Sequence, residues 1–150
     1  MTWEWGAARA GQYTLLYGRV QPADSTSASI PLFAYLVDSL GFLAVFRPNE
    51  IRYDDGFTAR VTGQTATIRV PSRATMVDVR GEDTLRVELT IEDATASDTR
   101  RPDVERGEGL SNRGLLHPYF VQMKGLMRLG GRVRGVPITG QGAGFFETYR

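Results

Sequence analysis

Residues 85–92, LRVELTIE, decide the fold of this chain, because apolar and polar side chains alternate there without a break. The apolar positions are Leu85, Val87, Leu89 and Ile91, and a polar residue follows each of them. Side chains of an extended strand point alternately to the two faces of a sheet. The stretch therefore predicts a β-strand with one face buried in a core and the other in solvent.

The same period of two recurs in shorter runs along the chain, at residues 12–20, 57–62 and 65–70. Glycine-containing turns, such as RGED at residues 80–83, separate these runs. Closely spaced strands with no amphipathic helix between them are typical of an antiparallel sheet that closes or nearly closes. We therefore predict an all-β fold, an antiparallel barrel in a single domain over residues 1–150, with very little helix.

Composition excludes several functional classes. The chain has 150 residues, 41% of them hydrophobic, which fits one globular domain. It contains no cysteine and a single histidine, His117, which excludes thiolate chemistry and a multi-histidine metal site. A net charge of +1 gives no sign of a nucleic-acid partner. We expect no metal or other cofactor and no nucleic acid.

No stretch of the sequence reaches the roughly 20 apolar residues of a membrane-spanning helix. The first residues, MTWEWG, lack the basic and then apolar pattern of a secretion signal. We therefore expect a cytoplasmic protein with no membrane span.

The hairpin from Pro31 to Phe46 is apolar on both faces. It lies either in the centre of the sheet or against a second protein surface. In the second case Phe33, Tyr35, Phe42 and Phe46 are the candidate contact residues, and they would support a homodimer or a partner barrel.

A polar run of 23 residues extends from Glu92 to Gly114. Loops longer than about 12–15 residues are usually lids, binding loops or disordered insertions. We predict a long surface loop here with few apolar contacts.

Aromatic residues are the main candidates for ligand binding. Trp3 and Trp5 share one face of a predicted strand, and Tyr17 and Tyr35 lie on neighbouring apolar runs. A barrel of about eight strands is either filled by side chains or holds one small hydrophobic ligand. We expect these four rings to line an apolar cavity.

Acid–base candidates are few. Asp38 directly continues a long apolar strand, so burial would keep its carboxyl group protonated and make it the candidate general acid. Glu4 lies between the two tryptophans and points to the opposite face, and we interpret it as a surface or arginine-paired group. We interpret Glu147 likewise as a surface or arginine-paired group, and His117 as an ordinary loop residue.

Both ends of the chain resemble a known family. WEWGAAR at residues 3–9 and GQYTLLY at 11–17 resemble the W-x-W-G…G-x-Y segment of hydroxyneurosporene synthase-like proteins, the carotenoid 1,2-hydratase or AttH-type family. GQGAGFFE at residues 140–147 resembles the final G-x-G-x-x-E strand of the same family, which includes fungal Diels–Alderases. Family members pair two lipocalin-like barrels in tandem, and these motifs match the second barrel. The Asn-Trp-Gly segment that usually precedes W-x-W-G has no counterpart here, and neither has the first barrel.

The resemblance implies a lipocalin-like barrel and leaves three hypotheses open. The first is binding of a hydrophobic isoprenoid- or polyketide-like molecule with hydration or cyclisation of a polyene, held in a reactive fold by the cavity. The second is a non-catalytic carrier of lipophilic molecules. The third is a structural half-domain that docks a second barrel. An open cavity with a buried carboxyl group would favour the first, a cavity without one the second, and a filled barrel the third.

Overall fold

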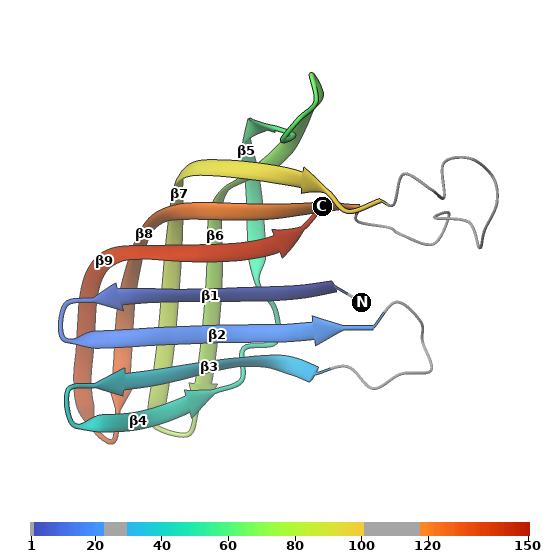
Figure 1. Ribbon diagram of the computed structural model, residues 1–150. Helices are drawn as coiled ribbons and strands as arrows, with labels where there is room; N and C mark the ends of the chain where they lie inside the picture. The colour runs from blue at the N-terminus through green and yellow to red at the C-terminus, as the bar shows by residue number, and fades with distance from the viewer. Residues whose placement is uncertain (1, 23–29, 101–117) are drawn as a thin grey trace.

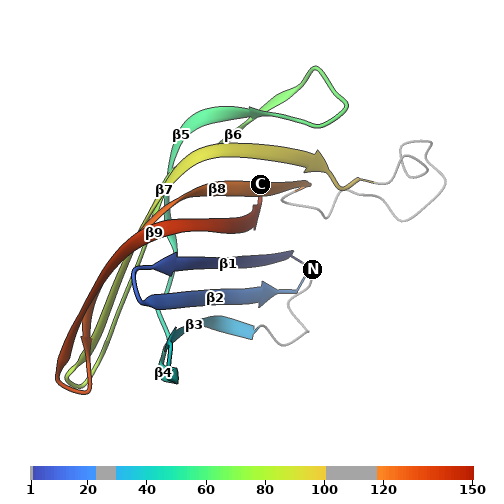
Figure 2. The ribbon, with the colours of Figure 1, turned by 60° about the vertical axis from the view of Figure 1, so that its left-hand side comes forward.

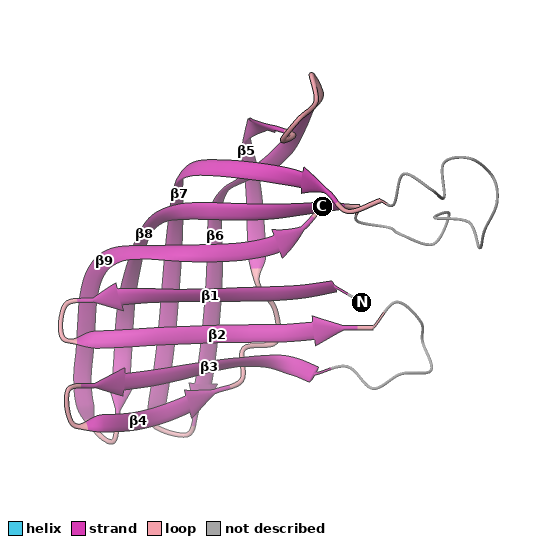
Figure 3. Ribbon diagram, in the orientation of Figure 1, coloured by secondary structure: helices cyan, strands magenta, loops and turns pink. Residues whose placement is uncertain are grey.

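The computed structural model describes residues 2–22, 30–100 and 118–150, and strands dominate them (Figure 1). Figure 3 shows strand and loop but no helix in this part of the chain, so it holds no helix that could cross a membrane. The nine strands described are β1 (Thr2–Ala10), β2 (Tyr13–Gln21), β3 (Ile30–Asp38), β4 (Gly41–Phe46), β5 (Arg52–Arg60), β6 (Thr67–Arg80), β7 (Asp83–Asp98), β8 (Tyr119–Val133) and β9 (Val136–Tyr149). The predicted all-β class is confirmed.

The strands form one antiparallel sheet in the order β4-β3-β2-β1-β9-β8-β7-β6-β5. The long strands β6 to β9 bend strongly, so the sheet curls around its own inner face (Figures 1 and 2). β4 and β5 are its two edges and do not pair with each other. Instead, the chain after β4 approaches β6, where the Arg47 amide donates to Oδ2 of Asp78 at 2.5 Å. The predicted lipocalin-like fold is therefore confirmed as a curled half-barrel.

The inner face of this sheet carries the core, as the alternation in β7 predicts. Leu85, Val87, Leu89 and Ile91 are all buried, while the polar residues between them face outward. The centre of the curl is filled by large side chains. Fully buried among these are Tyr17, Phe46, Phe146, Leu15, Leu36, Met76 and Met127.

The long loop was predicted to begin too early. β7 continues to Asp98, so residues 92–98 are strand, and residues 101–117 lie outside the described part. The reason is a β-bulge between Ile91 and Asp93, which shifts the register against β8. Beyond it Ala96 turns inward and is fully buried. A bulge inverts the alternation, so the polar sequence resembled a loop.

The hairpin from Pro31 to Phe46 lies at the edge of the sheet and presents its outer face to solvent. Tyr35 and Phe42 are exposed there, at 40% and 58%. Phe46 was wrongly expected among the contact residues, because it is 1% exposed and lies in the core. The bulge between Leu36 and Val37 shifts the β3–β4 register and explains this inversion.

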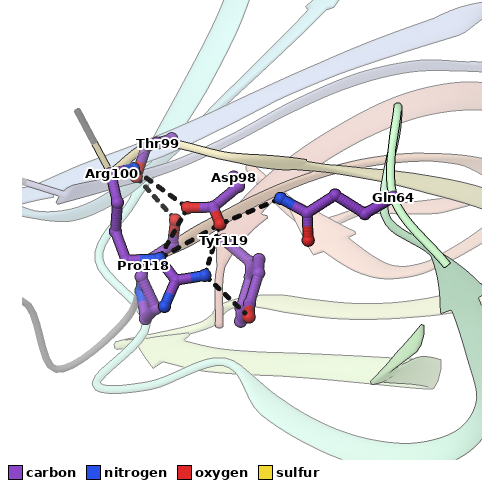
Figure 4. A network of polar contacts seen from close by, with 6 residues as sticks. All are labelled: Gln64, Asp98, Thr99, Arg100, Pro118 and Tyr119. Atoms are coloured by element: carbon purple, nitrogen blue, oxygen red, sulfur yellow. Dashed lines mark hydrogen bonds and ion pairs between the residues drawn. The ribbon is translucent and has the colours of Figure 1, made fainter. Parts of the chain in front are cut away.

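A polar network fastens the far end of β7 (Figure 4). Asp98 accepts a bond from Nε of Arg100 at 2.9 Å and one from Nε2 of Gln64 at 3.2 Å. Arg100 also reaches the hydroxyl of Tyr119, at 3.3 Å. The turn between β5 and β6 is thereby tied to the adjoining ends of β7 and β8. The hydrogen bonds from Arg100 hold the pKa of Asp98 well below its usual range.

The core assignment predicts a clear contrast between neighbours on β7. Leu89→Ala removes a side chain that is 2% exposed, so we expect the free energy of unfolding to fall by about 2–5 kcal/mol. Thr90→Ala, on the exposed face, is expected to change it by less than about 0.5 kcal/mol. Urea unfolding followed by circular dichroism measures both. Equal losses in the two variants would contradict the assigned faces.

The Asp98 network predicts a pH-dependent contribution to stability. Because the folded-state pKa of Asp98 is depressed, its contribution is complete above the unfolded pKa of about 4 and is lost as the pH falls towards the folded value. Asp98→Asn should therefore unfold at a lower temperature than the parent at pH 7, with the gap closing below about pH 4. Thermal melts at several pH values measure this. A gap that does not depend on pH would rule out the ionic role.

Candidate functional site

The inner face of β1 carries a buried carboxylate, Glu4, at the open end of the curled sheet. Glu4 is 8% exposed, and a charged group at such a position requires partners. Arg19 on β2 lies directly opposite in the strand register and forms an ion pair with it. The hydroxyl of Thr148 on β9 donates to Oε1 of Glu4 at 3.3 Å. Three strands thus converge on one carboxylate.

Tyr53 of β5 brings a hydroxyl group to the same cluster. Burial raises the pKa of Tyr53 well above its usual value, and the negative charge of Glu4 raises it further. The guanidinium of Arg150 lies over the Tyr53 ring, 4.6 Å from its centroid. The Tyr53 hydroxyl therefore stays protonated and can donate a hydrogen bond.

Tyr17 adds a second protonated hydroxyl. Its ring stacks on Phe146 with centroids 6.4 Å apart, and burial raises the pKa of Tyr17 well above its usual value. The negative charge of Glu4 raises it further. Within the described part of the chain the Tyr17 hydroxyl has no hydrogen-bond partner. An unsatisfied buried donor of this kind calls for explanation.

Gly6 makes room for Tyr17. The two residues lie opposite each other on β1 and β2, and a Cβ on Gly6 would come within 2.4 Å of the Tyr17 ring. Glycine is therefore required there for the tyrosine to pack against the backbone of β1. Gly6, the glycine of the W-x-W-G motif, and Tyr17, the second tyrosine of GQYTLLY, thus pack against each other.

The cluster lines a small pocket of about 110 Å³. Glu4, Arg19, Tyr53 and Thr148 form its polar wall. This volume equals a few water molecules at about 30 Å³ each, so it fits a polar group and not a whole lipophilic molecule.

A second pocket of about 330 Å³ shares Arg19 and Gln21 with the first, and its lining is mixed, with apolar Val20 and Leu32 beside polar Arg47 and Asn49. A polar hollow and one of mixed lining therefore meet at Arg19. This arrangement suits an amphipathic molecule.

The predicted ligand-binding residues do not line one cavity. Tyr17 lies inside the curl, but Trp3, Trp5 and Tyr35 lie on the outer face, with 38%, 36% and 40% of their surface exposed. Trp3 and Trp5 pack on outward-facing rings of β8 and β9. The closest of these pairs is Trp3 with Tyr149, whose ring centroids are 4.9 Å apart. The expectation that the four rings line one cavity is therefore corrected, because the buried face of β1 carries Glu4 and the tryptophans lie on its other face.

Asp38 lies away from the polar cluster. It ends β3 and closes the turn into β4, where its Oδ1 accepts a bond from the Leu40 amide at 2.8 Å. The register places Ile30, at the other end of β3, near the level of Trp3. Eight residues of strand separate the two ends of β3, or about 26 Å. The catalytic role of Asp38 stays a prediction that no contact with the cluster supports.

The position of Glu4 in the cluster was not expected, although the sequence contains a signal for it. Glu4 and Arg19 lie the same number of residues from the turn at Gly11 and Gln12, so a tight hairpin pairs them. Arg9, two residues after Ala7 on the tryptophan face, also marks that face as the outer one. His117 falls outside the described residues, and within residues 2–22, 30–100 and 118–150 no three acidic or histidine side chains gather as a metal site.

Comparison with known proteins finds likeness in structure. No family model matches the sequence, and no curated protein matches it. Among solved structures, kievitone hydratase from Nectria haematococca aligns over 99% of this chain and 39% of its own, with a TM-score of 0.52 and 14% identity. A protein of Nitrosomonas europaea assigned as AttH aligns over the same shares, with a TM-score of 0.45 and 17% identity. The chain thus spans about two fifths of these proteins. The fold of kievitone hydratase confirms the predicted resemblance to AttH-type barrels at the level of fold.

Proposed function

We propose that this chain binds a hydrophobic small molecule with an oxygen-bearing end and takes part in adding water to a carbon–carbon double bond. The observation that carries the proposal is the buried Glu4 carboxylate, paired with Arg19 in a pocket that Tyr53 also lines, with the buried Tyr17 ring against Gly6 two residues along β1. A base next to hydrogen-bond donors in a water-sized pocket is suited to hydration chemistry.

The roles of the side chains follow from their chemistry. The Glu4 carboxylate accepts a proton from a water molecule as the water oxygen bonds to one carbon of the double bond. The electron pair of that double bond moves onto a conjugated carbonyl oxygen, which receives a hydrogen bond from Tyr53. Glu4 then returns the proton to the second carbon, so the net change is the addition of one water molecule.

This scheme selects between the two expected ligand classes. Protonation of a plain polyene needs a neutral carboxylic acid and aromatic faces beside the resulting cation. Glu4 instead pairs with Arg19, and of the two tryptophans Trp3 lines the same pocket while Trp5 does not. Addition of water to a conjugated carbonyl compound needs a base and donors aimed at the developing oxyanion, which this cluster supplies. A polyketide-like substrate is therefore favoured over an isoprenoid hydrocarbon.

Two further observations support the proposal. The pocket that meets the cluster at Arg19 adds about 330 Å³ of space, and Val20, Leu32 and Pro48 are in the apolar part of its lining. The hydratase whose fold resembles this chain provides an analogy for the reaction type. Because the chain spans 39% of that protein, the activity of the whole relative is carried over only as part of the proposal.

The test uses trans-chalcone, a hydrophobic conjugated ketone, and squalene, a polyene hydrocarbon. We expect the chain to hydrate chalcone, seen as loss of conjugated absorbance and a gain of one water in mass, and to leave squalene unchanged. Glu4→Gln should lower the rate by about 10²–10⁴-fold and Tyr53→Phe by about 10²–10³-fold. Calorimetric titration with chalcone checks that both variants still bind.

Glu92→Gln is the matched control, because Glu92 is exposed on β7. Asp38→Asn tests the general acid that was expected from the sequence. If Glu4 is the base, the Asp38→Asn variant should retain full activity. Hydration that survives Glu4→Gln, or turnover of squalene alone, would contradict the proposal. Binding without turnover in the parent chain would favour a carrier.

A half-domain that docks a second barrel is the second candidate, and the outer aromatic face favours it. Trp5 and Phe145 contact each other there, with ring centroids 6.3 Å apart, and both remain more than a third exposed. Exposed rings of this kind mark interaction surfaces. Failure of the parent chain to bind either probe would move this candidate ahead.

A further inference from the structure

The free edge of β4 (Gly41–Phe46) is one of the two unpaired edges of the sheet in the described part of the chain. β4 pairs with β3 on one side, and no described strand lies along its other side. Figure 1 shows it beyond β3, at the end of the row that β1, β2 and β3 form. A free edge presents unpaired amide and carbonyl groups and is a template for another strand.

The two edges of the sheet differ in how they are protected. β5 carries two register shifts and the charged residues Arg52, Asp54 and Arg60, which are all exposed. Bulges and charges are the usual devices that prevent strand addition. β4 reads GFLAVF and has neither charge nor proline, and its single register shift against β3 brings Phe42 and Val45 to the same face. The β4 edge is therefore suited to pairing, and the β5 edge is not.

An aromatic row on the outer face leads to this edge. The ring centroids of Phe33 and Tyr35 are 5.0 Å apart, and those of Tyr35 and Phe42 are 6.1 Å apart. Phe42 is 58% exposed, and Leu40 in the preceding turn is 94% exposed. A strand added beside β4 would cover these apolar surfaces as well as satisfy the backbone.

We propose that the strand added there is β4 of a second copy, which forms a twofold-symmetric antiparallel dimer. Phe42 and Val45 share the outer face with Val37 and Tyr35, their partners on β3. A twofold axis between residues 43 and 44 sets Phe42 of each copy opposite Val45 of the other.

On the inner face, Leu43 and Ala44 contact the core and would face each other across the axis. Aromatic and β-branched side chains are favourable cross-strand neighbours. One strand therefore supplies both halves of a self-complementary interface, as twofold symmetry requires.

Light scattering and sedimentation of the full chain, from about 1 μM to about 1 mM, test the dimer. We expect a concentration-dependent dimer whose β4 amides exchange hydrogen more slowly as it forms, while β5 amides do not change. Phe42→Lys should raise the dissociation constant at least about tenfold. Adding Val45→Glu to Phe42→Lys should restore much of the affinity, because opposite charges then face each other across the axis.

Two controls separate edge pairing from other association. Thr58→Lys places the same charge on the β5 edge and should leave the dimer intact. Phe145→Lys alters the outer face away from β4, and a dimer lost in this variant but not in Phe42→Lys would show face-to-face docking. A monomer at every concentration, or a dimer with unprotected β4 amides, would overturn the proposal. A melting temperature equal to that of the parent confirms that each variant is folded.

Discussion

The ion pair between Glu4 and Arg19 is the constraint on which the open end of the sheet depends. A carboxylate on the inner face is tolerated only when it is paired and hydrogen-bonded. The β1–β2 hairpin supplies Arg19 by register alone, β9 supplies the Thr148 hydroxyl, and β5 supplies Tyr53 from the far edge of the sheet. Side chains from the start, the middle and the end of the chain therefore meet at one buried carboxylate.

The two faces of β1 separate the two kinds of interaction that the molecule offers. Inward, Gly6 admits the Tyr17 ring, and the polar cluster beside it lines a pocket of about 110 Å³. Outward, Trp3 and Trp5 join an aromatic surface that faces solvent. The chemistry proposed for the inner face and the association proposed for the outer face are compatible, because strand alternation keeps the two sets of side chains apart.

Most of the fold was predictable from alternation, and the errors have local physical causes. The period of two in residues 85–91 fixed the buried face of β7, because a strand with one apolar face has one favourable orientation. The bulge after Ile91 inverts the alternation, and residues 92–98 therefore resembled a loop. For β1 both faces hold apolar residues, so periodicity could not choose between Trp3 and Glu4. The hairpin pairing of Glu4 with Arg19 would have decided it. Tyr53 comes from the other edge of the sheet, and no local pattern places it in the cluster.

A double-mutant cycle on Glu4→Gln and Arg19→Met, read as the free energy of unfolding, tests whether the cluster depends on this ion pair. If the two side chains form the buried pair on which the cluster depends, each single change leaves a partner unsatisfied. The double variant should then lose less stability than the sum of the two single losses, with a coupling of roughly 0.5–3 kcal/mol. Additive losses would show that the two charges act independently and would contradict the account of the site.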